Sequence, residues 1–236
     1  MRRAALLLAV LALTSCGGSD EKLTVYAASS LTEVFEELAP GNRYNFAGSD
    51  ELATQLREGG KADVYAAASP RYPDELHAEG TVEQPVVFAT NQLVLVVPKR
   101  NPKHIAHVQD LTTGGFKIVL GAQGVPVGDY TRTALDKLGL TKVLDQVASE
   151  EENVKGVLTK VALGEADAGF VYTTDARTTA GKVMAIRLPP SAHADVRYPA
   201  AVVAASDQKD EARAFIELLR SAEGRRALER AGFGLP

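Results

Sequence analysis

VYAASSLT at residues 25–32 and NFAGSDEL at residues 45–52 share one design. Each passes from a strand-like stretch through small residues to a serine, Ser30 or Ser49, and then opens an amphipathic helical pattern. The first turn of a helix has unpaired backbone N–H groups and a partial positive charge. Two such turns aimed at one point can hold an oxyanion without lysine or arginine. The repeated pattern therefore predicts an anion receptor rather than a catalyst.

The same serines also fit a purely structural role. Ser30 and Glu33 have the spacing of a capping box, in which a serine and a carboxylate satisfy the backbone at a helix start. Ser49 is an ordinary N-cap residue for the helical pattern that follows it. The residues alone leave helix capping and ligand binding open as alternatives for each serine.

Strand and helix patterns alternate along most of the chain, which places it in the α/β class. Runs of strand length lie at residues 23–27, 43–47, 63–67, 92–97, 116–120, 168–172 and 198–204. Helical patterns lie at residues 31–38, 50–58, 73–79, 129–138, 154–163, 210–220 and 222–231. We expect this alternation to give parallel sheets covered by helices.

The order of these elements predicts two α/β lobes. Residues 23–97 together with 198–236 are assigned to lobe 1, and residues 98–197 to lobe 2. The chain then crosses between the lobes near Val97 and near Tyr198, and both crossings are natural hinges. Because open α/β sheets bind ligands beyond the carboxyl ends of their strands, we expect the ligand in the cleft between the lobes.

Residues 1–15 have the composition of a secretory signal peptide. A charged start, Arg2-Arg3, precedes an apolar run at residues 4–13 that is too short to span a bilayer. The run ends in the tetrapeptide LTSC, which resembles a bacterial lipobox, and Cys16 is the only cysteine of the chain. We expect Cys16 to be lipidated as the first mature residue, with residues 16–22 as anchor and flexible tether.

Composition and motifs argue against several function classes. The chain has a net charge of −4 and no basic cluster, which argues against nucleic-acid binding. None of the four histidines lies in a strand-end loop of the expected cleft, so a hydrolytic enzyme is the weaker alternative. His104 and His107 are three residues apart with no third ligand nearby, which favours solvent exposure over a metal site.

Lobe 2 offers two further helix starts and one aromatic side chain. A loop rich in glycine and proline at residues 121–130 leads into a helix. Asn153 is a good N-cap and leaves the amide of Val154 free in the first turn. Tyr172 ends a strand. On the residues alone, the loop also fits a tight strand-to-helix turn, and a strand-end tyrosine more commonly packs than binds.

With these residues assembled, the chain resembles the molybdate-binding proteins of bacterial ABC importers from Leu23 to Pro236. No single piece is diagnostic, but their order and spacing together are specific. The matching pieces are VYAASSLT (25–32), FAGS (46–49), ADVY (62–65), NQLVLVVPK (91–99), VPVG (125–128), NVKG (153–156), GFVY (169–172), YPAAVV (198–203) and GF (232–233).

The resemblance implies a two-lobe fold of the type II periplasmic binding proteins, with mixed sheets flanked by helices and the ligand in the interlobe cleft. In that family a tetrahedral oxyanion accepts hydrogen bonds from two serines, two backbone amides and a tyrosine. These roles fall on the hydroxyls of Ser30 and Ser49, the amides of Val127 and Val154, and the hydroxyl of Tyr172. The resemblance implies molybdate or tungstate as the ligand, held without direct metal ligands, and it implies no cofactor.

The resemblance also implies partners and a location. The protein would be a monomeric, extracytoplasmic lipoprotein, attached to the bacterial cell membrane only through the lipid on Cys16. It would deliver molybdate, and also tungstate, to the permease of an ABC importer. The two lobes would close around the anion, because donors from separate lobes reach one small ion only when the cleft is shut.

Three residues depart from the family pattern. Val127 is larger than the alanine common there, although its backbone donor is kept. Asp129 stands where a basic or neutral residue is common and would oppose a dianion if it faced the cleft. Gly48 replaces a frequent serine. Sulfate or another tetrahedral oxyanion stays an alternative ligand, and phosphate would need a buried acceptor such as Asp129 or Asp50.

The lipobox pattern generates the first testable prediction. Cys16→Ala removes the thiol that would carry the lipid, so the variant is expected to be released from the membrane or left unprocessed in its bacterial host. Anion binding by the remaining chain is expected to be unchanged. Intact-mass measurement of the native protein checks this directly, and an unmodified Cys16 would contradict it.

Overall fold

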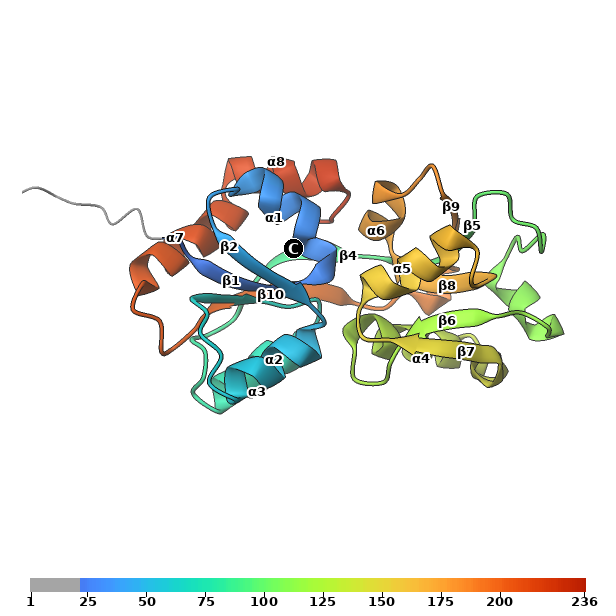
Figure 1. The fold of residues 1–236 in the computed structure, drawn as a ribbon, viewed down its shortest axis with the longest axis horizontal. Helices are drawn as coiled ribbons and strands as arrows, with labels where there is room; N and C mark the ends of the chain where they lie inside the picture. The colour runs from blue at the N-terminus through green and yellow to red at the C-terminus, as the bar shows by residue number, and fades with distance from the viewer. Residues whose placement is uncertain (1–21) are drawn as a thin grey trace, which may run out of the picture.

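Residues 22–236, which the computed structural model describes, form two lobes, each built on a five-stranded sheet (Figure 1). The predicted signal peptide (residues 1–15), Cys16 and the predicted tether up to residue 21 lie outside the described residues. Among residues 22–236, no helix has both the length and the apolar character needed to cross a membrane.

The two sheets have the same topology. The strands of lobe 1 are, in spatial order, β2 (Arg43–Ala47), β1 (Thr24–Ala28), β3 (Val64–Ala66), β10 (Val196–Val202) and β4 (Val86–Asn91). Those of lobe 2 are β7 (Val147–Glu151), β6 (Ile118–Gly121), β8 (Ala168–Tyr172), β5 (Leu93–Pro98) and β9 (Val183–Arg187). In both, the first three strands are parallel and the fourth runs antiparallel to its neighbours. The predicted mixed sheets are confirmed, whereas purely parallel sheets are wrong.

The antiparallel strand of each sheet is the one that follows a crossing between lobes. β4 ends at Asn91 and β5 begins at Leu93, so the first crossing lies at Gln92 and not near Val97. β5 pairs with β8 and β9, which puts residues 92–97 in lobe 2. An apolar run marks a strand buried on both faces, but it does not tell which of two sheets takes the strand. The second crossing leads into β10, so residues 196 and 197 join lobe 1.

Helices cover both faces of each sheet. In lobe 1, α2 (Ser49–Arg57) and α3 (Arg71–Ala78) lie on one face, and α1 (Thr32–Leu38), α7 (Lys209–Arg220) and α8 (Ala222–Ala231) lie on the other (Figure 1). In lobe 2, α4 (Pro126–Lys137) lies on the face opposite α5 (Val154–Leu163) and α6 (Thr173–Thr178). Short 3-10 helices are η1 (Ser29–Leu31), η2 (Val108–Thr113), η3 (Thr141–Gln146) and η4 (Pro190–Ala192). One apolar cluster runs from lobe 1 into lobe 2.

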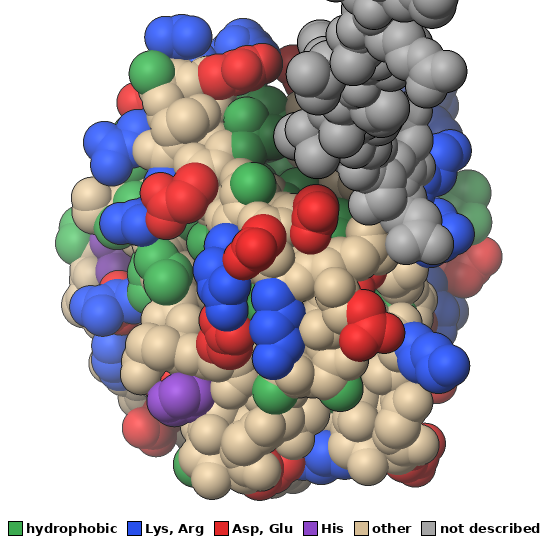
Figure 2. Space-filling view, turned by 90° about the vertical axis from the view of Figure 1, so that its left-hand side faces the viewer, with side chains coloured by type: hydrophobic (Ala, Val, Ile, Leu, Met, Phe, Trp, Pro, Cys, Tyr) green, Lys and Arg blue, Asp and Glu red, His purple; other side chains and the backbone are tan. Residues whose placement is uncertain are grey.

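The outer end of lobe 1 carries basic and acidic side chains interspersed with one another (Figure 2). Ion pairs on the surface of this lobe include Arg57 with Glu75 and Arg213 with Glu83. This face therefore has no single-sign field of the kind that attracts nucleic acid.

Candidate functional site

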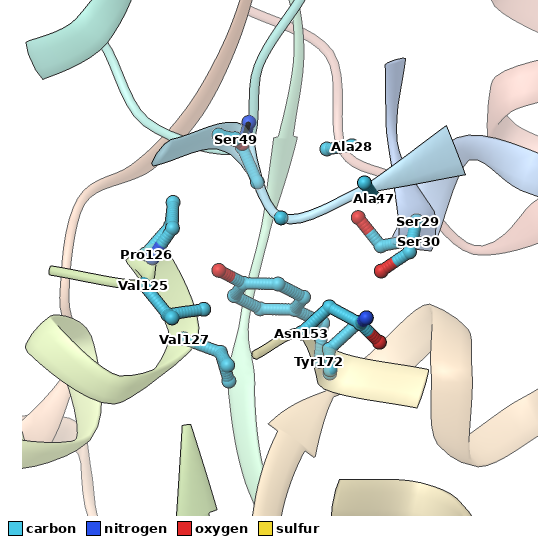
Figure 3. Close-up of a pocket in the computed structure, with 13 residues that line it drawn as sticks. Ala28, Ser29, Ser30, Ala47, Ser49, Val125, Pro126, Val127, Asn153 and Tyr172 are labelled. Carbon is cyan, nitrogen blue, oxygen red and sulfur yellow. Dashed lines mark hydrogen bonds between the residues drawn. The ribbon is translucent and has the colours of Figure 1, made fainter. Parts of the chain in front are cut away.

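A small cavity lies where the two lobes meet (Figure 3). Lobe 1 contributes the end of β1 with η1, the end of β2 with the start of α2, and Ala68. Lobe 2 contributes the starts of α4 and α5 and the end of β8. The lining residues are small, apolar or neutral polar: Ala28, Ser29, Ser30, Ala47, Gly48, Ser49, Ala68, Val125, Pro126, Val127, Asn153, Val154 and Tyr172. All five residues predicted to bind the anion are among them.

The cavity is matched to a small ion. The space open to the centre of a water-sized sphere is about 20 Å³. Adding the radius of that sphere gives a site of roughly 3 Å radius, which has room for one tetrahedral oxyanion and not for an organic molecule. The hydroxyl-bearing lining residues are almost fully buried, with exposed fractions of 7% for Ser29, 4% for Ser30, 1% for Ser49 and 1% for Tyr172.

Three α-helices begin at the wall of the cavity. The first residues of α2, α4 and α5 are Ser49, Pro126 and Val154, and all three line it. Proline is favoured at the first helical position because the N–H it lacks has no partner there. Three helix starts directed at one point add their partial positive charges, and this favours an anion in a site that has no basic side chain.

Two backbone amides of lobe 2 are left without acceptors. The side chain of Asn153 caps α5, as predicted, and accepts from the amides of Lys155 and Gly156 at 3.1 Å each. The amide of Val154 then has no acceptor within residues 22–236, and the same is true of the Val127 amide in the first turn of α4. Buried amides without partners are rare, so a ligand is expected to supply the acceptor.

Neither serine acts as a helix cap. The N-cap residues of η1 and α2 are Ala28 and Gly48, and neither helix start has a side-chain cap. Ser49 Oγ instead accepts a hydrogen bond from the amide of Ala68 at 3.0 Å. That bond uses a lone pair of the oxygen, so the hydroxyl proton of Ser49 stays available to a ligand. The capping alternative, left open by the residues alone, is therefore wrong for both serines.

Ser30 is linked to two residues, Tyr198 and Asn91, that were not predicted to belong to the site. Its hydroxyl lies 2.9 Å from the hydroxyl of Tyr198 on β10, and Asn91 Nδ2 donates to Tyr198 Oη at 3.4 Å. In the arrangement that uses every proton, Tyr198 donates to Ser30 and Ser30 donates into the cavity. Tyr198 begins the matching piece YPAAVV, but no local sequence pattern indicates that its hydroxyl contacts Ser30, 168 residues earlier in the chain.

Tyr172 carries the clearest sign of a missing partner. Its hydroxyl is fully buried, yet it makes no hydrogen bond within the described chain. Burial raises the pKa of Tyr172 well above its usual value, so the hydroxyl keeps its proton and is a donor. Figure 3 shows its ring reaching in among lining residues from both lobes. An unpaired buried hydroxyl costs free energy that a bound acceptor would recover.

Two aspartates considered from the sequence lie beside the cavity without lining it. Asp129 Oδ1 accepts from the amide of Gly124 at 2.9 Å, and its other oxygen lies 3.4 Å from Arg71. Asp50 stands in the first turn of α2, where burial, followed by repulsion from Asp129 and Glu152, raises its pKa. Neither aspartate lines the cavity, and Asp50 Oδ1 is buried without a hydrogen-bond partner within residues 22–236.

At Gly48 the backbones of the two lobes lie close together. A Cβ atom at this position would lie 2.4 Å from the carbonyl oxygen of Glu152 in lobe 2. A residue with a side chain, such as serine, therefore has no room here with the lobes in this arrangement.

The histidines do not contribute to the cavity. None of them lines it, and His107 instead caps η2. Within residues 22–236, no group of three histidine, cysteine, aspartate or glutamate side chains could hold a metal ion. The cavity thus contains hydrogen-bond donors but no paired nucleophile and base of the kind that hydrolysis requires.

A sequence profile of the bacterial extracellular solute-binding proteins matches residues 23–234. The chain belongs to this family. Within it, the molybdate-binding protein ModA of Mycobacterium tuberculosis strain H37Rv is 40% identical over 224 residues, which span 91% of this chain and 85% of that protein. A Bacillus subtilis relative, the putative ABC transporter substrate-binding lipoprotein YvgL, is 30% identical over 89% of this chain and 85% of its own length. The resemblance found in the sequence is confirmed.

Solved structures show the same fold. The periplasmic molybdate-binding protein of Azotobacter vinelandii superimposes with a TM-score of 0.81, covering 91% of this chain and all of that one, at 20% identity. At that level of identity the likeness concerns the fold alone. The two-lobe architecture of this solute-binding protein is therefore shared with a protein of much lower sequence identity.

A buried carboxylate lies just beyond the cavity. Asp175, in the first turn of α6, is 1% exposed, and neither of its oxygens has a hydrogen-bond partner within residues 22–236. Burial raises the pKa of Asp175 from 3.8 to about 7, against a smaller opposing effect of Lys155 and with a further increase from Glu33. Between about pH 4 and pH 7, Asp175 is therefore protonated in the folded protein and ionised in the unfolded chain.

This proton predicts how stability depends on pH. Between about pH 4 and pH 7, the free energy of unfolding is expected to fall by roughly 1.4 kcal/mol per pH unit through Asp175 alone, with no further loss above that range. Asp175→Asn removes the cost of a buried charge, so the variant should be more stable than wild type at about pH 8 and lose this advantage toward pH 4. Urea unfolding at several pH values measures the difference; parallel pH profiles would contradict the assignment.

Proposed function

We propose that this solute-binding protein captures molybdate outside the cytoplasm and delivers it to the permease of an ABC importer. The observation that carries the proposal is the fully buried Tyr172 hydroxyl without a partner, which faces a cavity where two amides also lack acceptors. The names of the relatives support molybdate as the anion and an importer as the destination. The ligand makes five hydrogen bonds in this proposal, from Ser30, Ser49, Val127, Val154 and Tyr172.

The chemistry of these donors suits a fully deprotonated oxyanion. Hydroxyl and amide groups offer protons, while no carboxylate lines the cavity to accept one. A protonated anion such as hydrogen phosphate would bring a donor of its own that finds no strong acceptor, and that mismatch is costly in a buried site. Molybdate and tungstate carry the same charge on nearly the same tetrahedron, so we propose that both bind.

Sulfate is selected against by size. Its bonds to oxygen are shorter than those of molybdate, so a sulfate in contact with one lobe leaves the donors of the other lobe too far away. The donors come from two lobes, and Gly48 already lies against Glu152, which limits how much further the cleft can shrink. The discrimination therefore depends on the distance between the donors of one lobe and those of the other.

The location belongs to the same proposal. The lipobox-like LTSC ending at Cys16 supports a lipid anchor. The Bacillus subtilis relative YvgL is itself named a lipoprotein, which supports the same location. An anchored, monomeric receptor would keep the captured anion close to the membrane and so to the permease.

The proposal is tested by the anions themselves. Calorimetric titration of the chain lacking residues 1–21 is expected to give tight 1:1 binding of molybdate and tungstate, weaker binding of sulfate and no binding of phosphate. Molybdate at a hundredfold excess over its dissociation constant should also stabilise the native state by about 2.7 kcal/mol. Equal affinity for sulfate and molybdate would refute the size argument, and no molybdate binding would refute the proposal.

The individual donors give a further prediction. Ser30→Ala, Ser49→Ala and Tyr172→Phe should each weaken molybdate binding by about 1.5–3 kcal/mol, because each removes a hydrogen bond to a charged partner. Val127→Ala is the matched control, since it keeps the backbone donor and should change affinity little. The same titration measures all four variants. Wild-type affinity in both serine variants would show that the anion is bound elsewhere.

A further inference from the structure

Outside the cavity, the two lobes also touch through side chains that do not line it. Tyr72, on α3 of lobe 1, donates its hydroxyl hydrogen to the carbonyl of Gly124 in lobe 2. The neighbouring Arg71 lies 3.4 Å from Asp129 at the start of α4. Tyr72, Gly124, Arg71 and Asp129 are all absent from the cavity wall.

The peptide units of Gly124 are held from both sides. Its N–H donates to Asp129 Oδ1 at 2.9 Å, within lobe 2, and its carbonyl accepts from Tyr72, across the cleft. Gly124 has a φ of +93°, in the left-handed region that only glycine enters easily. The chain continues directly from Gly124 through Val125 and Pro126 to Val127. How Gly124 is held therefore sets where the start of α4, and with it the Val127 amide, points.

We propose that Tyr72 is a positioning residue of the anion site, whose hydroxyl holds the Gly124 carbonyl and so fixes the loop that presents the Val127 amide. The inference rests on the proposed function, because it concerns the same anion. Tyr72 touches no ligand and acts only through Gly124.

Burial distinguishes this contact from two ion pairs that also join the lobes beside the cavity. Lys155 pairs with Glu33 on another side of the cavity, but the two side chains are 28% and 51% exposed. Arg71 and Asp129 are 54% and 37% exposed. Water and salt screen such pairs, and their net effect is small. Tyr72 is 6% exposed and bonds to a backbone carbonyl, so its contribution is the one expected to be measurable.

The contact spans the cleft, so it exists only while the lobes are closed. An anion that enters the open cleft does not meet it, whereas an anion that leaves must wait until it breaks. Tyr72 is therefore expected to slow dissociation without changing association. It is also expected to leave the unfolding temperature of the anion-free protein unchanged, because that state does not depend on closure.

The test compares two tyrosines of lobe 1 that make the same kind of bond. Tyr72→Phe removes a bond between lobes; Tyr44→Phe removes a bond within lobe 1, where the hydroxyl donates to the Ala39 carbonyl at 2.7 Å. Bound radiolabelled molybdate is chased with unlabelled molybdate to give the dissociation rate, and circular dichroism gives the unfolding temperature without anion. Tyr72→Phe should speed dissociation about three- to tenfold at unchanged association and unfolding temperature. Tyr44→Phe should lower only the unfolding temperature.

A second pair of variants addresses the same glycine from lobe 2. Asp129→Ala frees the Gly124 N–H and should also speed dissociation, whereas Asp129→Asn keeps an oxygen at that position and should restore a rate near wild type. Wild-type dissociation in both Tyr72→Phe and Asp129→Ala would overturn the role of Tyr72 while leaving molybdate binding intact. A wild-type protein that retains no label would refute the proposed function and this role with it.

Discussion

An anion taken out of water must be stabilised by hydrogen bonds and dipoles when no positive side chain is beside it, and the cavity between these lobes is built to that constraint. Its wall combines three helix starts, two unpaired amides and buried hydroxyls, with no charged side chain. Small residues such as Ala47 and Ala68 leave room for the backbone to approach the anion closely. Because one lobe holds only part of this set, the chemistry requires both lobes and therefore two crossings of the chain.

The crossings are tied to the site by hydrogen bonds. Asn91, the last residue of β4, donates through Nδ2 to Thr174 Oγ1 of lobe 2 at 2.9 Å and to Tyr198 Oη at 3.4 Å. Tyr198 stands on the returning strand β10 and meets the hydroxyl of Ser30. A rotation of the lobes about these strands would thus act on the proposed donor Ser30 directly, through the hydrogen bonds of Asn91 and Tyr198. The hinge and the cavity share the same small polar network.

Much of the architecture follows from local pattern. The bounds of β2, β8, α5 and α8 match the predicted ranges; Asn153 caps the start of α5, and a glycine follows the last turn of α5 and of α8. The missed elements are β4, β7, α6 and β9. Of these, β7 is a polar edge strand, β9 is an edge strand of five residues, α6 is one and a half turns, and β4 is separated from β5 only by Gln92. Which of the two sheets takes β5 is decided by tertiary packing and not by local sequence, so the predicted position of the first crossing was wrong. In the same way, the resemblance to a known family located the five predicted donors among the lining residues, but it gave no role to Tyr198 or Tyr72.

The use of peptide groups as donors has a consequence for how such receptors diverge. A peptide N–H persists whatever side chain is attached to it, so positions such as Val127 and Val154 are free to drift while the ion still meets the same donors. Selection then acts on shape: the proline that begins α4, the glycine that lets two backbones meet at Glu152, and the hydroxyls that no peptide can replace. Receptors of this kind can lose most of their sequence identity and keep their chemistry, and a search for invariant charged residues would overlook them.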